Sequence, residues 1–388
     1  MSRLLFWAGA ATLAWTLVVF PAVVLLRGVF LRRPHREGPI TPRVTIIVSA
    51  HNEVASIGAK LESLLALDYP SEQVEIVVAS DGSDDGTNDL VATFADRGVR
   101  LLPLDRVGKA AALNTAVGQA SGDILVFSDA NSLFTADALR ALVAPFADPE
   151  VGGVAGDQRY LPSDGMVGER SYWSFDRIMK TYESQAGHVI SATGAIYAIR
   201  RSLFQPVPGD VTDDFVISTG VIEQGHRLVF APSAVAFEPV SAASDVEFGR
   251  KVRIATRGFR SVLARRALLD PRIHGFYSLQ LFSHKVLRRL MAIPLLAIAL
   301  ATAMLWHRGG IYQLAGLAQA GFYGLAGLGI ALGDRPAGRH PLLSLPAFFT
   351  IVNWAALLAA VNVLRGRRIE RWEPARPSSP EGRDEVVR

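Results

Sequence analysis

Long apolar segments at the two ends of the chain constrain this protein more than any other feature. Leu4–Leu26 carries no charged side chain, and three further apolar segments lie near the other end, at Leu290–Trp306, Ile311–Leu332 and Leu342–Leu364. A helix of about 20 such residues crosses the hydrocarbon core of a bilayer. These segments also explain the positive mean hydropathy of +0.26. The sequence therefore predicts a membrane protein with one N-terminal and about three C-terminal transmembrane helices.

Basic residues around the first apolar segment predict its orientation. Five arginines follow it within residues 27–43, whereas only Arg3 precedes it. Because positive residues are retained on the cytoplasmic side, we expect the following domain in the cytoplasm, at a bacterial-type inner membrane. A cleaved signal peptide is the alternative, although its apolar region would be shorter and would end at small residues.

The charges at the far end of the chain do not agree with this orientation. Four crossings from an external N-terminus place the tail outside, yet the arginines of residues 365–371 favour the cytoplasm. Either one apolar segment is re-entrant or the tail departs from the rule. The tail itself, 365–388, is polar and proline-rich, and we expect it to be disordered.

Between the apolar ends, short β-branched runs alternate with helical patterns. Examples are Val44–Val48, Val74–Ser80 and Ile124–Phe127. This alternation predicts a doubly wound α/β sheet, in which ligands bind beyond the carboxyl ends of the strands. The chain then divides into an anchor (1–30), a basic linker (31–43), a cytoplasmic α/β domain (44–244), basic interfacial helices (245–289), transmembrane helices (290–364) and the tail.

Residues 245–289 combine basic and apolar side chains. Helices of this kind lie at a membrane surface, with their cations among anionic lipid headgroups, although a solvated basic face is the alternative. The net charge of +4 would also suit nucleic acid, but the apolar neighbours of these basic residues explain it, and we expect no nucleic-acid partner. The chain has no cysteine, which excludes disulfides, zinc–thiolate sites and cysteine nucleophiles.

Polar residues follow the first two predicted strands. Asn52 and Glu53 supply an amide and a carboxylate for a nucleobase edge or ribose hydroxyls, or else they only begin a helix. Asp81 starts an acidic turn, in which Gly82 lets the backbone approach a ligand; an Asp-Gly turn without function is the alternative. Carboxylates at this edge would repel a bare phosphate, so they indicate a metal ion, a hydroxyl or a base as the ligand.

Two more motifs follow along the same predicted sheet. Lys109 begins a helix, where an ammonium and the helix dipole together favour a diphosphate; a surface lysine is the alternative. The segment is not a P-loop, because Pro103 and Ala110 replace its glycine and its Ser/Thr. Asp129 and Asn131 end a strand as two oxygen donors one residue apart, which suits a divalent cation such as Mg²⁺ or Mn²⁺.

The second half of the domain carries a Thr-Gly pair and two adjacent aspartates. Gly194, after Thr193, would let a ligand approach the backbone closely, or would serve close packing. Asp213 and Asp214 would place a general base beside a second carboxylate, or would be the acidic first turn of a helix.

Taken together and in this order, the motifs resemble those of the family 2 glycosyltransferases, the membrane-embedded relatives of cellulose, hyaluronan and chitin synthases. The resemblance covers roughly Val44–Pro271 and implies a GT-A fold for 44–244. It also implies a role for each motif residue. Asp214 would be the catalytic base, and the metal would be bound by Asp129 and Asn131. The acceptor would be faced by Thr193, Gly194 and Asp213. The nucleotide-sugar would be bound by Asn52, Glu53, Asp81, Lys109, Asp129 and Arg253.

Two departures from the family pattern affect what the resemblance implies. Asn131 replaces the second acid of Asp-x-Asp, and Arg250–Ile254 keeps only Arg253 of Gln-x-x-Arg-Trp. Without the stacking tryptophan, processive synthesis is less strongly implied.

The implied reaction is inverting transfer from a nucleotide-diphospho-sugar, with a UDP-sugar as the expected donor, to a glycan or lipid hydroxyl in exopolysaccharide or envelope glycan synthesis. Membrane lipids are expected partners as well. Single glycosylation of a lipid and a non-enzymatic sugar-nucleotide-binding scaffold are the alternatives. No Gly-x-Gly-x-x-Gly follows the first strand, which disfavours a dinucleotide enzyme.

Overall fold

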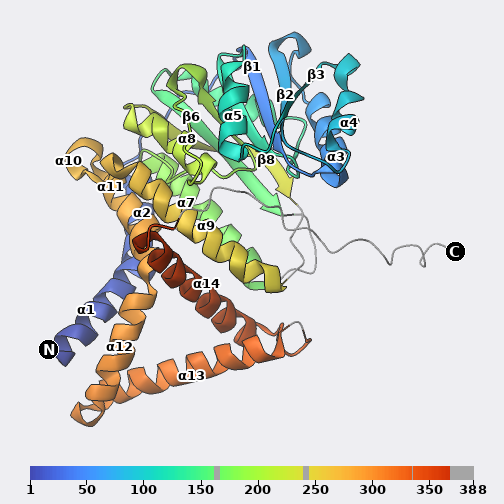
Figure 1. Ribbon diagram of the computed structural model, residues 1–388. Coiled ribbons are helices and arrows are strands. Elements are labelled where there is room, and N and C mark those ends of the chain that lie inside the picture. The colour runs from blue at the N-terminus through green and yellow to red at the C-terminus, as the bar shows by residue number, and fades with distance from the viewer. Residues whose placement is uncertain (161–166, 239–243, 334, 368–388) are drawn as a thin grey trace.

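The computed structural model describes residues 1–160, 167–238, 244–333 and 335–367 and has two parts (Figure 1). A sheet with helices on its faces forms the upper part in this view, and long helices descend from it. The two apolar ends of the chain meet in the lower part, where α1 (Ser2–Ala14) packs against α12 (Ala292–Met304). This contact is close, because a Cβ atom on Gly9 would lie 2.7 Å from Ile298.

The sheet has eight strands in the order β3-β2-β1-β4-β7-β6-β8-β5. β1 to β4 are parallel, β7 runs antiparallel to β4 and β6, and β8 is parallel to β6. The mixed sheet agrees with the GT-A prediction, and the carboxyl ends of β1, β2 and β4 share one edge. The strands are β1 Val44–Ala50, β2 Val74–Asp81, β3 Val99–Leu104, β4 Ile124–Asp129, β5 Leu133–Phe134, β6 Val151–Tyr160, β7 Tyr197–Arg200 and β8 Arg227–Glu238.

Alternate residues of the central strands serve two cores, one on each face of the sheet. Ile46 belongs to the core that includes side chains of α3, α4 and α6, and Ile47 to the core that includes side chains of α5 and α8. A run that is apolar at every position requires helices on both faces, as the sequence predicted. These helices are α3 Val54–Leu65, α4 Thr87–Ala92, α5 Lys109–Gly118, α6 Ala138–Val143 and α8 Asp213–Glu223.

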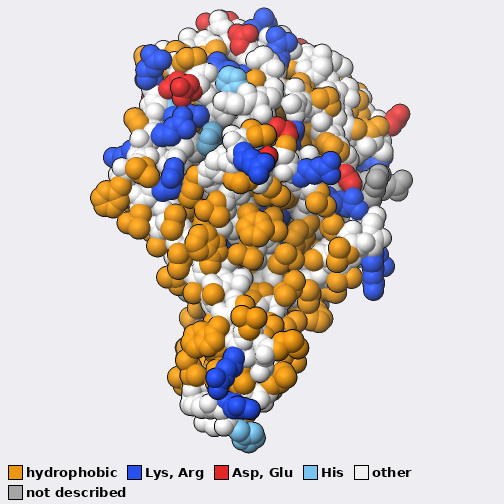
Figure 2. Space-filling model, turned by 90° about the vertical axis from the view of Figure 1, so that its left-hand side faces the viewer, with side chains coloured by type: hydrophobic (Ala, Val, Ile, Leu, Met, Phe, Trp, Pro, Cys, Tyr) orange, Lys and Arg blue, Asp and Glu red, His pale blue; other side chains and the backbone are white. Residues whose placement is uncertain are grey.

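Within the described residues, three helices are long and apolar enough to cross a membrane. They are Ser2–Phe30, which comprises α1, η1 (Trp15–Val19) and α2 (Phe20–Phe30), then α13 (Gly310–Leu332) and α14 (Pro341–Leu364). Figure 2 shows hydrophobic side chains over the lower half of one face, Lys and Arg above them, and a small basic group at the lower tip. An apolar band between polar ends suits a membrane-embedded part.

The segment predicted at Leu290–Trp306 forms a broken helix instead of a simple span. Phe276–Leu290 and Ala292–Met304 are bent by 54° and make a fourth crossing only if they are taken as one span. Pro294 explains the break, because it has no N–H for the carbonyl of Leu290.

Two amphipathic helices join the membrane part to the sheet domain. α7 (Val167–Ala186) packs on α2, and α9 (Ser244–Ala264) packs on α14. A Cβ atom on Gly28 would lie 2.7 Å from the Tyr182 carbonyl oxygen, so the anchor touches α7 closely. After α9 the chain continues through η6 (Arg266–Leu269), α10 (Pro271–His274), α11 (Phe276–Leu281) and η7 (Phe282–Leu287).

The linker lies along the sheet domain. Arg227 is buried and donates hydrogen bonds to the carbonyl oxygens of Arg33 (2.7 Å) and Pro34 (3.0 Å). Of the tail predicted at 365–388, residues 368–388 lie outside the described residues.

Candidate active site

Lys109 joins two of the acidic motifs at the carboxyl edge of the sheet. Its Nζ lies 2.7 Å from Oδ1 of Asp129, which ends β4, and 3.1 Å from Oδ2 of Asp213, which begins α8. Burial alone would lower the pKa of Lys109, but the two carboxylates outweigh it and raise that pKa. Three residues from separate parts of the sequence therefore form one charged cluster at the carboxyl edge of the sheet.

Asp214 lies next to this cluster but is not part of an ion pair within the described chain. Its Oδ1 accepts a hydrogen bond from the backbone N–H of Phe215 (2.8 Å). Burial and then the charge of Asp213 raise the pKa of Asp214 to about 6, against the opposing charges of Lys109 and Lys285. A carboxylate that titrates near the working pH is suited to act as a general base.

The loop before α8 is held by α9. The hydroxyl oxygen of Ser261 accepts a hydrogen bond from the Thr212 N–H (2.9 Å) and lies 2.8 Å from the Thr212 hydroxyl. Arg257 donates through Nε to the carbonyl of Val211 (2.9 Å), and Arg260 pairs with Asp210 (2.9 Å). Several cations of the predicted interfacial helices thus bind the loop that carries Asp213 and Asp214, which the sequence did not reveal.

Asp81, at the end of β2, fixes the loop that leads to Lys109. Its Oδ1 accepts hydrogen bonds from the N–H groups of Val107 and Gly108, both at 2.8 Å, and its Oδ2 pairs with Arg106 (2.9 Å). The side chain is buried. Asp81 therefore positions the start of α5, and its direct contact with a nucleotide stays a prediction.

Asn52 and Glu53 lie in the turn after β1. Asn52 has φ +56°, and its amide exchanges two hydrogen bonds with Asp84, at 2.8 and 2.9 Å. Glu53 accepts a hydrogen bond from the Ser56 hydroxyl (2.6 Å), and its pKa is raised chiefly by burial, with a smaller contribution from the charge of Asp129. Glu53 thus faces the charged cluster, whereas the Asn52 amide ties two loops of the same edge together.

Gly194 approaches the side chain of Asp129 from the neighbouring segment. The Asp129 N–H donates to the Gly194 carbonyl (3.1 Å), and a Cβ atom on Gly194 would lie 2.6 Å from Asp129 Oδ2. The absence of a side chain at 194 therefore leaves room for the second oxygen of Asp129. The Thr193 hydroxyl beside it is buried and has no hydrogen-bond partner in the described structure.

The residues present fit a divalent cation that arrives with a phosphorylated substrate. Within the described residues no group of three or more His, Cys, Asp or Glu side chains could hold a metal ion. Asp129 would supply a carboxylate oxygen and Asn131, half-buried in the turn after β4, an amide oxygen. Mg²⁺ and Mn²⁺ accept such a small set of protein oxygens when substrate phosphates and water complete the shell.

Lys60 is a buried lysine behind Asp129 that the sequence analysis did not single out. Its Nζ donates to Oγ of Ser128 (2.7 Å) and to the carbonyl of Ser132 (2.5 Å). Burial holds the pKa of Lys60 well below its usual value, against the charges of Asp129 and Glu238. The signal was present in the sequence, because Lys60 occupies an apolar-face position of the amphipathic α3.

Tyr197 is a second residue that the sequence analysis missed. Its ring stacks on Phe127 at 5.0 Å, and its hydroxyl is buried without a hydrogen-bond partner in the described parts. Burial, followed by the charges of Asp213, Asp214 and Asp129, raises the pKa of Tyr197 well above its usual value. Tyr197 lies in a continuous apolar strand run, which gives no sign of a polar neighbourhood.

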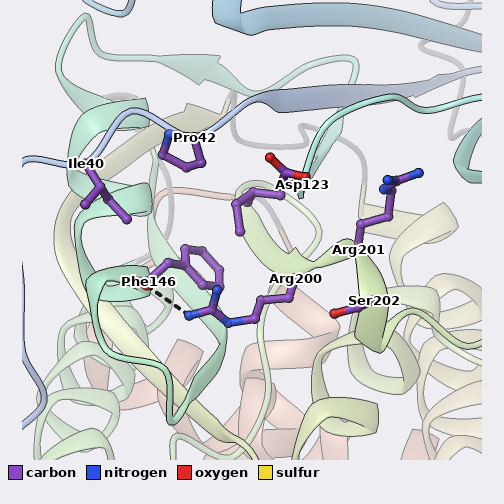
Figure 3. A pocket seen from close by; sticks show the side chains of 8 residues that line it. Ile40, Pro42, Asp123, Phe146, Arg200, Arg201 and Ser202 are labelled. Carbon is purple, nitrogen blue, oxygen red and sulfur yellow. Dashed lines mark hydrogen bonds between the residues drawn. The ribbon is translucent and has the colours of Figure 1, made fainter.

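The pocket in Figure 3 lies at the start of β4, the opposite end of that strand from Asp129. Arg253 is half-buried on α9, one turn before Arg257, and its contact with a diphosphate stays a prediction. The pocket, of about 470 Å³, is lined by Asp123 and Ile124 at the start of β4 and by Arg200 at the end of β7. Arg200 donates to the Phe146 carbonyl there (2.9 Å), so its guanidinium serves the fold.

Comparisons with known proteins identify a glycosyltransferase model over the part of the chain that carries most of these residues. The family model described as glycosyl transferase family 2 matches residues 45–207, which include Asp81, Lys109, Asp129 and Gly194. A solved mannosyltransferase, PcManGT from Pyrobaculum calidifontis in complex with GDP-Man and Mn²⁺, has a TM-score of 0.71. It is 26% identical, over 94% of this chain and 100% of that one. Residues 45–207 therefore form a glycosyl transferase family 2 domain.

The curated relatives that match this chain align with it over only part of their length. The "Probable glycosyltransferase YdaM" of Bacillus subtilis is 26% identical over 240 residues, 58% of this chain and 57% of the relative. The poly-beta-1,6-N-acetyl-D-glucosamine synthase of Staphylococcus aureus (strain COL) is 27% identical over 230 residues, 57% of this chain and 55% of the relative. The chain therefore spans about half the length of the curated relatives that it matches.

Proposed function

We propose that this glycosyltransferase transfers a sugar, with inversion, from a nucleotide-diphospho-sugar to a hydroxyl acceptor at the cytoplasmic face of a membrane. The observation that carries the proposal is the Lys109 ion pair with Asp129 and Asp213, beside an Asp214 whose pKa is raised to about 6. The names of the relatives support a place in exopolysaccharide or cell-envelope glycan synthesis.

In the proposed reaction, Asp214 removes the proton of the acceptor hydroxyl as its oxygen bonds to C1 of the donor sugar. The bond from C1 to the diphosphate oxygen breaks, and its electron pair leaves with the nucleotide diphosphate. This single displacement inverts the anomeric centre. Lys109, at the N-terminus of α5, stabilises the charge that grows on the diphosphate. A divalent cation on Asp129 and Asn131 would add positive charge beside the same leaving group.

The donor base is proposed to be uracil, recognised beyond β1 and β2 near Asn52, Glu53 and Asp81. The similar mannosyltransferase structure contains GDP-Man, so guanine is the alternative. Nucleotide diphosphate release from a panel of UDP- and GDP-sugars, with Mg²⁺ or Mn²⁺, distinguishes the donors and the ions.

The function is tested by Asp214→Asn in the purified full-length protein. We expect donor affinity to stay within about twofold while transfer falls by about 100-fold or more, because general-base catalysis contributes factors of this size. Asp137→Asn, an exposed aspartate at the start of α6, is the matched control and should keep wild-type activity. Transfer by Asp214→Asn at a rate similar to the wild type would refute the assignment of the base.

A second candidate function is a single transfer to a lipid acceptor. It is favoured by a lysine on the membrane side of Asp214, described below, and by the departure of Arg250–Ile254 from the processive pattern. Size analysis of the product after supplying labelled donor separates a polymer from a single addition.

A further inference from the structure

Lys285 is a half-buried cation next to Asp214 that the proposed reaction does not use. It lies on η7, and its Nζ is 6.0 Å from the centre of the Phe215 ring, the residue after Asp214. The charges of Asp214 and Asp176 both act on Lys285. Even so, Lys285 makes no ion pair or hydrogen bond within the described part of the chain, and its position calls for an anionic partner.

The acids around Lys285 are already engaged by other groups. Asp176 pairs with Lys180 (3.0 Å). Glu183, on the same helix, accepts a hydrogen bond from the Ile190 N–H (3.0 Å) and faces His284 (3.5 Å). The remaining neighbour, Asp214, must stay available to the acceptor hydroxyl in the proposed reaction.

Further positive charge lies on the same side. The guanidinium of Arg289 is 5.5 Å from the centre of the Phe259 ring, and its charge acts on Lys285. A nearby like charge disfavours the charged form of a partly buried lysine, whereas a nearby anion favours it.

The choice of lysine at this position is itself informative. The chain has five lysines against 35 arginines. Four of the five lie near acids of this region. Lys109 pairs with Asp129 and Asp213, Lys180 pairs with Asp176, and the charges of Asp129 and Asp214 act on Lys60 and Lys285 respectively. An ammonium is a compact point charge that binds phosphate oxygens in little space, whereas a guanidinium needs room for its planar fork.

The backbone at Lys285 is also unusual. η7 is a π-helix of six residues, Phe282–Leu287, on the chain that leads from the domain into α12. π-helical turns are rare and frequently mark functional sites. An anion bound by Lys285 would lie between Asp214 and the start of the membrane helices.

We propose that Lys285 binds the phosphate or diphosphate of a lipid-linked acceptor and so places the reacting hydroxyl at Asp214. The proposal rests on the proposed function and narrows its acceptor to an amphiphile with a phosphate beside the glycan. A neutral glycan chain would give Lys285 no charged partner, whereas the phosphate of a lipid would. η7 also contacts the N-terminal anchor through the hydrogen bond from the Trp15 indole to the Ser283 hydroxyl (3.0 Å).

The test measures binding of farnesyl diphosphate to the purified full-length protein in neutral phosphatidylcholine nanodiscs. We expect Lys285→Met to weaken binding by about tenfold or more and Lys285→Arg to weaken it less, because a charge-assisted contact is lost in the first variant and distorted in the second. Lys251→Met is the matched control. Lys251 lies on α9 over the Phe348 ring (4.9 Å), and its loss should leave binding of the probe unchanged.

Three results would overturn the inference. The first is loss of charge selectivity: wild type and Lys285→Met bind farnesyl diphosphate with equal affinity, or wild type binds uncharged farnesol as tightly as farnesyl diphosphate. The second is displacement of the probe by phosphatidylglycerol in the nanodisc, which would make Lys285 a contact for bulk lipid headgroups. The third is an equal loss of UDP or GDP affinity in Lys285→Met, which would assign the lysine to the donor. If Lys285→Met does not fold, Lys285→Gln replaces it with the same expected loss.

The outcome also separates this inference from the proposed function. Failure of the wild-type protein to bind any nucleotide diphosphate would contradict the proposed function itself. Normal nucleotide binding, together with a probe that does not distinguish Lys285→Met from wild type, would contradict only the role of Lys285.

Discussion

Asp213 and Asp214 are adjacent in the chain but have different electrostatic surroundings. Asp213 pairs with Lys109, whereas Asp214 makes no ion pair among the described residues and has a pKa raised to about 6. Because a general base works in its ionised form, kcat/KM should fall about tenfold for each pH unit below about 6 and level off above it. A pH profile of nucleotide release measures this limb.

The same profile tests the cause of the raised pKa. The negative charge of Asp213 raises the pKa of Asp214, so Asp213→Asn should lower that pKa and move the acid limb to lower pH. The rate on the plateau is expected to fall too, since Lys109 loses one of its two carboxylates. An acid limb that stays in place, or moves to higher pH, would show that Asp214 does not titrate in this reaction.

At the scale of elements, α9 holds the loop before α8 in place through hydrogen bonds to its backbone. Ser261→Ala removes the acceptor of the Thr212 N–H, and we expect a loss of about 1–3 kcal/mol in stability from the unpaired buried group. The loop should then hold Asp214 less accurately, so kcat should fall by about tenfold while donor affinity is kept. Steady-state kinetics and donor binding separate the two effects.

The matched control for this variant lies on the same helix. Thr256 is fully buried, and among the described residues its hydroxyl bonds only to the Val252 carbonyl within α9 (2.8 Å). Thr256→Val should therefore leave kcat near the wild-type value. A similar loss of kcat in both variants would mean that any disturbance of α9 matters, and that Ser261 has no particular role.

The strand ends and α9 differ in how far the sequence could predict their part in the site. The strand-end motifs with Asp81 and Asp129 were predictable, because parallel strands bring their carboxyl ends to one edge. The contact of Ser261 with Thr212 was not, since it depends on how an amphipathic helix docks against a loop 49 residues earlier in the chain. A basic amphipathic pattern gives no information on which of its cations face protein and which face lipid.

The sequence also did not predict which polar side chains are buried near the site. Lys60 could have been noticed as a charge on the apolar face of α3, but its bonds to Ser128 and Ser132 follow from packing across the sheet. Tyr197 gave no signal at all, because a tyrosine in an apolar strand is ordinary. Both residues reach the neighbourhood of Asp129 through contacts between elements that are distant in the sequence, which no local motif reveals.

At the scale of the whole molecule, the contacts at the end of α14 indicate on which side of the membrane the C-terminal tail begins. The number of apolar segments and the arginines of residues 365–371 gave opposite predictions for that side. Arg260 pairs with Asp210 of the catalytic domain and donates through Nε to the carbonyl of Arg367, just after α14 (3.0 Å). The end of α14 therefore lies beside the catalytic domain. In Figure 1, α12 descends from the domain, α13 runs across the lower end and α14 returns.

We infer from this path that the chain crosses the membrane at Ser2–Phe30, at the bent pair that ends in α12, and at α14. α13 lies across the far side (Figure 1), although it is itself long and apolar enough to span. Three crossings put the arginines after α14 on the cytoplasmic side, in agreement with the positive-inside rule. Because the chain has no cysteine, single cysteines report the side directly. Three exposed positions serve: Glu37 in the linker, Arg308 between α12 and α13, and Arg365 after α14.

A membrane-impermeant maleimide should label Arg308→Cys in intact spheroplasts and should label Glu37→Cys and Arg365→Cys only in inverted vesicles. Glu37→Cys is the control, because it precedes the catalytic domain on the same side. Labelling of Arg365→Cys together with Arg308→Cys would place the end of α14 on the far side of the bilayer. Arg260 could not then reach Arg367, since a contact between them requires both to lie at one face of the membrane.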